Sequence, residues 1–413
     1  MTEALTVWVE GRTVGELSTT EGAWRFEYSP QWLADGDAFS LSPHLLLRAR
    51  PFVDGADDRR VQWFFDNLLP EGGIRSALAA YAGLSEKDSF GLLARFGEES
   101  AGALTLLPRG APYPAPGGYD PLPHDELRRL IAELPSVPLL AASGRAKMSL
   151  AGAQHKLGLH RIGSDLLLPR QAASSVIIKP DHALPERYPF APANEHFSMT
   201  VAREVGLPAP DTALLHLPEP VYVVRRYDRR VEGGTVRRLH QIDLCQVLNK
   251  WPGYKYEGEG GVTFIEAFRA LDNTRQPAVA RNQLLRWLIF NFVIGNSDAH
   301  AKNVSFMVGP SGIDLAPVYD LLCGKAYGDD YLAMSIGEQN RYGHVSRDDW
   351  DALASSIRMR PAFVNQLREE LAKTMPAAAR RTLARPEFLP EERRFLEGVV
   401  AIIDEHATAT AAE

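Results

Sequence analysis

Apolar and polar residues alternate in short runs near the start of the chain. Leu5 to Val9 alternate, Glu10-Gly11-Arg12 interrupts the pattern, and alternation resumes from Val14 to Leu17. Trp24 to Tyr28 is a third run of this kind. A period of two predicts half-buried strands, and the short Gly-containing connection predicts a hairpin. We therefore expect a β-rich subdomain at this end of the chain.

Two segments mark where that subdomain ends. Val61 to Leu69 is densely apolar and aromatic, and such clusters are more often core than ligand site. From Pro108 to Pro123, about half of the positions are Pro or Gly, so this stretch is not expected to hold a helix. We place the first domain boundary there.

Strand-like patterns follow this boundary and helical patterns come later. Strands are expected at Leu157 to Ile162, Asp165 to Leu168, Ser175 to Lys179 and Val221 to Tyr227, and a helix at Asn194 to Val205. Later helices are expected at Asn282 to Phe292, Trp350 to Arg385 (more than one helix, given Pro361 and Pro376) and Glu391 to His406. The predicted divisions are a subdomain 1–107, a linker 108–123, a strand-rich lobe 124–224, a helical lobe 225–405 and a frayed tail 406–413.

Composition narrows the class of protein. At 413 residues the chain is too long for one core, so two or three domains are expected. Its 45% hydrophobic and 23% charged residues are typical of a soluble globular protein. The net charge of -7 argues against a chain that coats nucleic acid by itself.

Cysteines and apolar stretches indicate the compartment. The two cysteines, Cys245 and Cys323, lie in apolar settings and are expected to be buried thiols, with a disulfide or a reactive thiol as alternatives. The first residues lack the pattern of a signal peptide, and no apolar stretch reaches the length of a membrane helix. We expect a cytoplasmic protein that does not enter the membrane.

A polar loop between two apolar segments carries the most informative chemistry. In Ile294-Gly-Asn-Ser-Asp-Ala-His-Ala-Lys-Asn303, four residues separate Asp298 from Asn303. This is the spacing of the kinase catalytic loop, in which Asp accepts the proton of the substrate hydroxyl and Asn holds magnesium. Taken alone, the spacing is weak evidence, because Asp and Asn are common loop residues and local Asx turns explain it better.

A second carboxylate is needed to bring magnesium to the phosphates of a nucleotide. Asp314 lies in an expected strand, where its side chain is compatible with an edge or outward position. Asp320 follows Pro317, where the strand breaks, and suits the second magnesium ligand of a kinase. The sequence favours Asp320 only mildly.

A lysine on a strand is the third element. Lys179 ends the β-branched run Ser175 to Lys179, where a charge is costly unless it is paired or reaches solvent. A kinase pairs such a lysine with nucleotide phosphates and with a helix glutamate, for which Glu195 is the candidate.

The fourth element is the small-residue segment Ser149-Leu-Ala-Gly-Ala-Gln-His-Lys156. Small residues let backbone N–H groups approach phosphate oxygens, and Lys156 adds a positive charge. Each of the four signals is weak. Their order along the chain is nevertheless the order of parts in a kinase, which makes coincidence a poor explanation.

These residues resemble the HipA family of serine/threonine kinase toxins, which belong to type II toxin–antitoxin systems. The matching segments are Phe64-Phe-Asp-Asn-Leu-Leu-Pro70, Ser149 to Lys156, Ile178-Lys-Pro180, Asn194-Glu195, Arg226-Tyr-Asp-Arg229, Asp298-Ala-His-Ala-Lys-Asn303 and Pro317-Val-Tyr-Asp-Leu321. The resemblance implies an α+β, protein-kinase-like fold of two lobes, with a strand-rich N-lobe, an extra N-terminal β-rich subdomain and an all-helical C-lobe.

The resemblance also implies a role for each matching position. Asp298 would be the catalytic base, Asn303 and Asp320 would bind Mg²⁺, and Ser149 would be an inhibitory autophosphorylation site. The remaining roles concern ATP: a phosphate loop of Ala151, Gly152, Ala153, Gln154, His155 and Lys156, the phosphate-binding Lys179, a hinge of Arg225, Arg226 and Tyr227, and the nearby His300 and Lys302. Two residues depart from the family: Arg225 stands where Glu is frequent, and His155 where Glu or Pro is frequent.

Partners and substrate are further implications of the resemblance. The expected partner is a HipB-like helix-turn-helix antitoxin, which mediates contact with operator DNA. The expected substrate is an aminoacyl-tRNA synthetase, typically the glutamyl enzyme, whose phosphorylation halts translation and growth. Two other functions stay open: a small-molecule phosphotransferase, and a non-catalytic, kinase-like corepressor.

Overall fold

The N-terminal residues form a five-stranded antiparallel sheet in the order β4-β3-β2-β1-β5. The computed structural model describes residues 3–115, 117–132, 154–182, 184–217 and 219–412. The strands of this sheet are β1 (Glu3–Val9), β2 (Arg12–Thr20), β3 (Ala23–Tyr28), β4 (Phe52–Val53) and β5 (Leu104–Pro108). Leu5 pairs with Leu17 across the first two strands, which confirms the predicted hairpin.

Four helices accompany this sheet: α1 (Pro30–Leu33), α2 (Arg60–Asp66), α3 (Gly72–Ala82) and α4 (Ser89–Phe96). The apolar run predicted from Val61 to Leu69 contributes α2 and the residues after it. Phe64 and Phe65 are buried there, and the Phe65 ring packs 5.7 Å from Phe26 of β3. This run is therefore core, as the sequence predicts.

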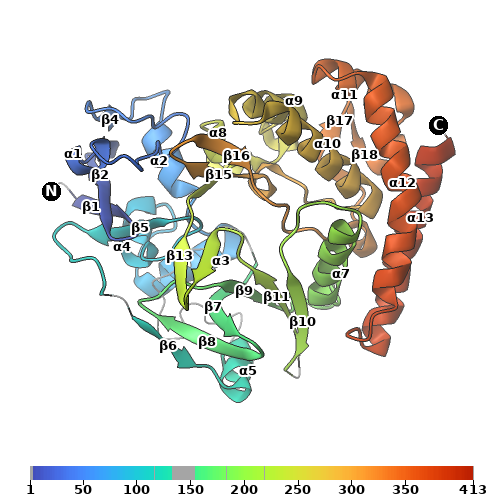
Figure 1. Ribbon diagram of the computed structural model, residues 1–413, viewed down its shortest axis with the longest axis horizontal. Helices are drawn as coiled ribbons and strands as arrows, with labels where there is room; N and C mark the ends of the chain where they lie inside the picture. The colour runs from blue at the N-terminus through green and yellow to red at the C-terminus, as the bar shows by residue number, and fades with distance from the viewer. Residues whose placement is uncertain (1–2, 116, 133–153, 183, 218, 413) are drawn as a thin grey trace.

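A second sheet has six antiparallel strands in the order β10-β11-β9-β7-β8-β6 and crosses the lower part of Figure 1. Its strands are β6 (Gly118–Pro121), β7 (Leu157–Ile162), β8 (Asp165–Arg170), β9 (Val176–Pro180), β10 (Thr212–His216) and β11 (Pro220–Arg225). Strand β6 lies inside the predicted linker 108–123. Its edge position explains how a Pro- and Gly-rich segment joins the sheet, because an edge strand tolerates proline.

Helix α7 (Ala191–Glu204) packs against β10 and β11 and against the C-terminal helices (Figure 1). Nearly all of its residues are buried, including Glu195. Helix α5 (His124–Ala132) follows β6 and precedes β7 along the chain. The C-terminal region contains α8 (Leu244–Val247), α9 (Phe264–Ala270), α10 (Pro277–Ile294), α11 (Arg347–Ser356), α12 (Pro361–Leu383) and α13 (Pro390–Ala412).

The C-terminal lobe differs from the prediction in being only partly helical. It also contains the strand pair β12 (Arg229–Glu232) and β13 (Thr235–Arg238), the three strands β14 (Gln241–Asp243), β15 (Ser305–Gly309) and β16 (Gly312–Leu315), and the pair β17 (Tyr331–Ile336) and β18 (Gln339–Arg341). The strand expected around Asp314 is confirmed as β16. The other strands have three to six residues, too few for periodicity to reveal reliably.

Two details of this lobe differ from the prediction. More than one helix covers Trp350 to Arg385, as predicted, since α11 ends at Ser356 and Pro361 begins α12, but Pro376 lies inside α12 and does not end it. The tail predicted to fray after residue 406 continues as α13 to Ala412. His406 is buried and its Nδ1 lies 3.0 Å from the carbonyl oxygen of Phe292 in α10. Packing against α10 therefore holds this part of α13 in place. Within the described residues, no helix is long and apolar enough to cross a membrane.

Candidate active site

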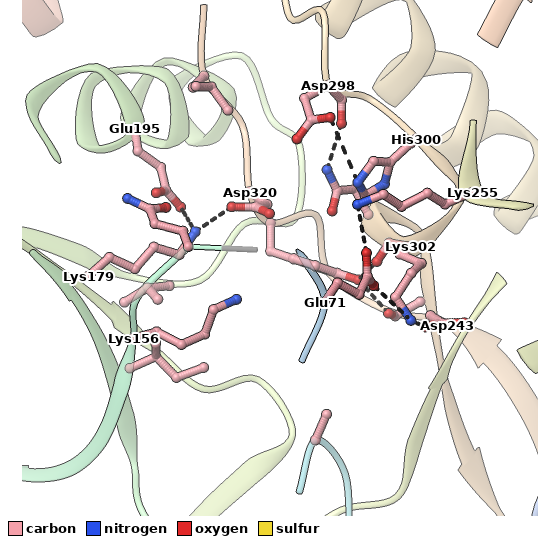
Figure 2. Close-up of a pocket in the computed structure, with 18 of the residues that line it drawn as sticks. Glu71, Lys156, Lys179, Glu195, Asp243, Lys255, Asp298, His300, Lys302 and Asp320 are labelled. Carbon is pink, nitrogen blue, oxygen red and sulfur yellow. Dashed lines mark hydrogen bonds and ion pairs between the residues drawn. The ribbon is translucent and has the colours of Figure 1, made fainter. Parts of the chain in front are cut away.

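A pocket lies between the six-stranded sheet, the N-terminal subdomain and the loops of the C-terminal lobe (Figure 2). Twelve residues singled out from the sequence line it: Gln154, Lys156, Lys179, Glu195, Arg225, Arg226, Tyr227, Asp298, His300, Lys302, Asn303 and Asp320. His155 is half-buried and is not among the described lining residues. Ser149, Ala151, Gly152 and Ala153 lie outside the described residues.

Lys179 is held between two carboxylates on one side of the pocket (Figure 2). It is the second-to-last residue of β9, and its Nζ lies 2.7 Å from Glu195 Oε1 on α7 and also donates to Asp320 Oδ1. Burial disfavours the charged ammonium, but Asp320 and Glu195 outweigh it and raise the pKa of Lys179. The lysine is therefore a buried, paired cation and does not extend into solvent.

Glu195 shares Lys179 with Asp320, and this affects its protonation. Burial, together with the negative charge of Asp320, raises the pKa of Glu195 to about 7, although Lys179 acts in the opposite direction. Lys156 points toward the same cavity in Figure 2. Burial and the charge of Lys179 lower the pKa of Lys156 to about 8. This side of the pocket thus brings two amines close to two carboxylates.

The geometry distinguishes Asp320 from Asp314. Asp320 lines the pocket with a backbone φ of 59°, in the left-handed region that costs a non-glycine residue of the order of 1–3 kcal/mol. Burial alone would raise its pKa, but Lys179 and Lys156 lower it. Asp314 lies on β16, is paired with Arg275 and is not among the described lining residues. Asp320 is therefore the pocket carboxylate.

Asp298 and Asn303 lie on the opposite side, in the loop between α10 and β15. Asn303 Nδ2 donates to the carbonyl oxygen of Asp298 at 2.8 Å, which closes the loop. The backbone N–H of Asp298 donates to Asn296 Oδ1 at 3.0 Å, so the Asx turn is supplied by Asn296. The side chain of Asp298 is 47% exposed. Its carboxylate is thus accessible from the pocket.

Lys302 and His300 hold this loop in place. Lys302 Nζ lies 2.6 Å from Asp243 Oδ2 and 2.7 Å from Asn67 Oδ1, so its charge is already satisfied by the N-terminal subdomain and β14. His300 is buried, which lowers its pKa, and its Nε2 lies 3.8 Å from Asp298 Oδ1. Both residues line the pocket, and the contacts of Lys302 indicate a bracing role.

The predicted hinge is anchored by ion pairs. Arg226 is buried and donates to Asp228 Oδ2 at 2.7 Å and to Ser174 Oγ at 2.9 Å. Arg229 also pairs with Asp228, and both arginines reach Glu99 of the N-terminal subdomain. Tyr227 donates to Gln241 Oε1 at 2.5 Å. The side chain of Arg226 is therefore engaged within the protein, while Arg225 is exposed.

Sequence reasoning missed several lining residues, among them Asn67, Glu71, Asp243, Lys255 and Tyr256. Tyr256 donates to Asp298 Oδ1 at 2.6 Å, across 42 positions of sequence. Glu71 pairs with Lys255 at 2.7 Å. Asn67 lies within Phe64 to Pro70, a segment that resembles the HipA family, and this resemblance is only a weak signal for a lining residue. No local pattern marks the other four, because their partners are distant in sequence.

Family comparisons bear on this arrangement. Residues 148–379 match the model of the HipA-like C-terminal domain, and residues 5–107 match that of the HipA N-terminal domain. The chain belongs to the HipA family. Its fold is accordingly the α+β, kinase-like fold of HipA, and its family is one of toxin kinases.

Individual relatives agree with this assignment. The chain is 38% identical to Y4mE of Sinorhizobium fredii over 92% of this chain and 91% of that one. It is 31% identical to the serine/threonine-protein kinase toxin HipA of Shewanella oneidensis, over 79% and 77% of the two chains. A chain in the solved complex of HipA, HipB and operator DNA from Shewanella oneidensis matches with a TM-score of 0.85 and 26% identity, covering 98% of this chain and 96% of that chain.

Proposed function

We propose that this HipA-family protein is an ATP- and Mg²⁺-dependent serine/threonine protein kinase. The observation that carries the proposal is the convergence of Lys179, Glu195 and Asp320 with Asp298 and Asn303 around one pocket. Lys179, Glu195 and Asp320 come from three separate segments, and Asp298 and Asn303 share one loop. Together they are the charge-carrying parts of a phosphoryl-transfer site. Catalysis would rest on positioning and charge neutralisation.

The residues present suit magnesium and a nucleotide. Asp320 and Asn303 would hold Mg²⁺, since carboxylate and amide oxygens are suitable ligands for this hard cation. Magnesium, when bound, neutralises charge on the phosphates. Among the described residues, no group of three or more His, Cys, Asp or Glu side chains is arranged to hold a metal alone. Magnesium sites in kinases commonly use one or two carboxylates together with substrate phosphates.

Each remaining residue has a defined task in this mechanism. Lys179 would bind nucleotide phosphates while Glu195 orients its ammonium. Lys156 and the residues of the loop 151–156 would add contacts to the phosphates, and residues 225–227 would lie beside the adenine. Asp298 would accept the proton of the incoming serine or threonine hydroxyl.

The biological role is proposed from the relatives. We infer that the chain is the toxin of a toxin–antitoxin pair and acts in the cytoplasm, with a HipB-like helix-turn-helix antitoxin as partner and operator DNA reached through it. Support comes from the toxin name of the Shewanella oneidensis relative and from the HipB and operator DNA in the similar complex. The proposed substrate is an aminoacyl-tRNA synthetase of the glutamyl type, and the proposed off-switch is autophosphorylation of Ser149.

The test is incubation of the purified protein with radiolabelled ATP and Mg²⁺, alone and with a cell extract, beside Asp298→Asn. Label on the protein and on an extract protein, absent with the variant, supports a protein kinase. Label only on a small molecule would indicate a small-molecule phosphotransferase. If no label appears in a sample that mass spectrometry shows to lack phosphate on Ser149, the kinase proposal is wrong and a non-catalytic corepressor becomes the better hypothesis.

A further inference from the structure

The phenol of Tyr256 contacts the proposed catalytic base directly. Its hydroxyl donates to Asp298 Oδ1 at 2.6 Å, a short distance that is typical of a hydrogen bond to a carboxylate. Burial and the negative charge of Asp298 both raise the pKa of Tyr256, so the phenol keeps its proton and acts as the donor. The contact therefore occupies one of the two carboxylate oxygens of Asp298.

The backbone around Tyr256 is held by several hydrogen bonds. Its carbonyl oxygen accepts from the N–H groups of Glu259 at 3.2 Å and Gly261 at 3.0 Å. The neighbouring Glu257 accepts from the backbone N–H of Ser335 at 2.6 Å. The phenol is thus presented by a turn that is fixed at both its backbone and its flanking side chain, which suits a positioning role better than a mobile gate.

The ring of Tyr256 is also fixed from two sides. It packs edge-on against His300 with ring centroids 5.0 Å apart and an interplanar angle of 79°. Lys255 Nζ lies 5.0 Å from the ring centroid and pairs with Glu71 at 2.7 Å. Glu71 belongs to the N-terminal subdomain. This subdomain therefore reaches Asp298 through Lys255 and Tyr256. Figure 2 labels Glu71, Lys255 and Asp298.

We propose that Tyr256 is a positioning residue that orients the carboxylate of Asp298 for phosphoryl transfer, an inference that rests on the proposed kinase function. With Oδ1 held by the phenol, Oδ2 is the oxygen that receives the proton of the incoming hydroxyl. Rotation of the carboxylate would break the hydrogen bond from Tyr256. Orientation of the general base matters because proton transfer requires hydrogen-bond reach to the substrate hydroxyl.

The opposite reading is that the phenol imitates a substrate hydroxyl and blocks the base. The two readings predict opposite changes in turnover when the hydroxyl alone is removed. Tyr256→Phe removes it and keeps the ring that packs on His300. The matched control is Tyr254→Phe, two residues earlier in the chain, where the residue is 41% exposed.

The experiment measures kcat and the KM for ATP of the wild type, both Phe variants and Asp298→Asn, with dephosphorylated casein as acceptor. We expect Tyr256→Phe to lower kcat about 10-fold, a part of the roughly 10²- to 10⁴-fold that a positioned general base contributes. The KM for ATP should stay within about twofold, because no nucleotide contact is removed. Tyr254→Phe should match the wild type in both constants.

Each other outcome overturns the proposal in a recognisable way. Equal kcat in the two Phe variants would show that the phenol has no effect on transfer, and a higher kcat in Tyr256→Phe would show that it blocks the base. Loss of ATP binding along with kcat would show a structural role only. If the wild type itself gives no Asp298-dependent label, the kinase function fails first and a role of Tyr256 in transfer fails with it.

Discussion

The ammonium of Lys179 lies 2.7 Å from Glu195 Oε1, and the side chains of both residues are less than one-tenth exposed. This pair joins the end of β9 to α7, and Lys179 also donates to Asp320 on the same side of the cavity. A lysine in this setting is both part of the candidate site and part of the core. Its removal should therefore affect function and stability together.

Lys179→Met should lower the free energy of unfolding by roughly 3–5 kcal/mol, because it leaves two carboxylates near each other in a buried site without their cation. It should also abolish ATP binding. Urea denaturation and ATP titration measure the two effects. Lys250→Met is the control, since Lys250 pairs with Glu266 at a partly exposed site and its loss should cost about 0–1 kcal/mol. Equal stability of the two variants would contradict the prediction.

Asp320→Asn and Asp314→Asn should differ in their binding of ATP in the presence of Mg²⁺. Asp320 lines the pocket, whereas Asp314 is paired with Arg275 away from it. We expect about a tenfold or greater loss of affinity for Asp320→Asn, since a hydrogen bond or ion contact to a charged group contributes about 1.5–3 kcal/mol. Asp314→Asn should bind as the wild type does. Calorimetry in Mg²⁺ would test this, and weaker binding by Asp314→Asn would overturn the assignment.

Protonation of Asp228 should contribute to the loss of the free energy of unfolding at acidic pH. Burial opposes its ionisation, but Arg226 and Arg229 outweigh burial and hold its pKa below the ordinary value. A carboxyl group whose pKa is lower in the folded state than in the unfolded state, where it is about 3.9, stabilises the folded protein at pH values above about 3.9. This stabilisation is lost as the pH falls from about 3.9 toward the pKa of the folded state. Asp228→Asn should therefore show a smaller loss of stability between about pH 5 and pH 2.

The measurement is the free energy of unfolding across that pH range. At pH 7, Asp228→Asn should be less stable by roughly 3 kcal/mol, because two buried guanidiniums lose a charged partner. Asp211→Asn serves as the control, since Asp211 pairs with Arg203 at the surface. An acid profile of Asp228→Asn identical to that of the wild type would contradict the mechanism.

Glu71→Gln should lower turnover without weakening ATP binding. Burial would raise the pKa of Glu71, but Lys302 and Lys255 lower it, so Glu71 is an anion that joins two lysines near Asp298. Its neutralisation should loosen the turn that carries Tyr256 and reduce kcat about threefold to tenfold, within the range expected when a general base is displaced. Glu86→Gln, in the same subdomain and exposed, should retain wild-type kcat.

Both cysteines should be unreactive in the folded protein. Cys245 and Cys323 are buried and are not disulfide-bonded. Burial raises the pKa of both thiols, that of Cys323 to about 12, and the thiolate is the reactive form. A thiol reagent at pH 8 should therefore detect no thiol until urea unfolds the chain, when two should react. Rapid reaction of one thiol without urea would show local opening.

Local features of the site could be predicted from the sequence because they depend on nearby residues. The loop from Asp298 to Asn303 is closed by a hydrogen bond within itself, and it lies between α10 and β15 as the apolar pattern predicts. Lys179 at the end of a strand and Glu195 on the next helix were predicted in the same way. The N-terminal hairpin also follows from alternation and a short turn.

Other features depended on contacts between distant segments. The sequence could not exclude Asp314 as the second magnesium ligand. Only the fold shows that Asp314 pairs with Arg275, whereas Asp320 pairs with Lys179 in the pocket. Lys302 was expected near the nucleotide, yet its ammonium bonds to Asn67, 235 residues away. Most of the short strands in the C-terminal lobe were not predicted. They form because they pair with strands elsewhere in the lobe, and short strands carry little periodic signal in the sequence.

By itself, then, the sequence determined the order of the chemical groups, the elements that carry them and the family to which the chain belongs. The tertiary structure decided which of those groups meet, and it added Tyr256, Lys255 and Glu71 to the site. The physical reason is that hydrogen bonds and ion pairs act over a few ångströms of space, whatever the separation along the chain. A residue such as Tyr256 acquires its role only when folding brings it to Asp298.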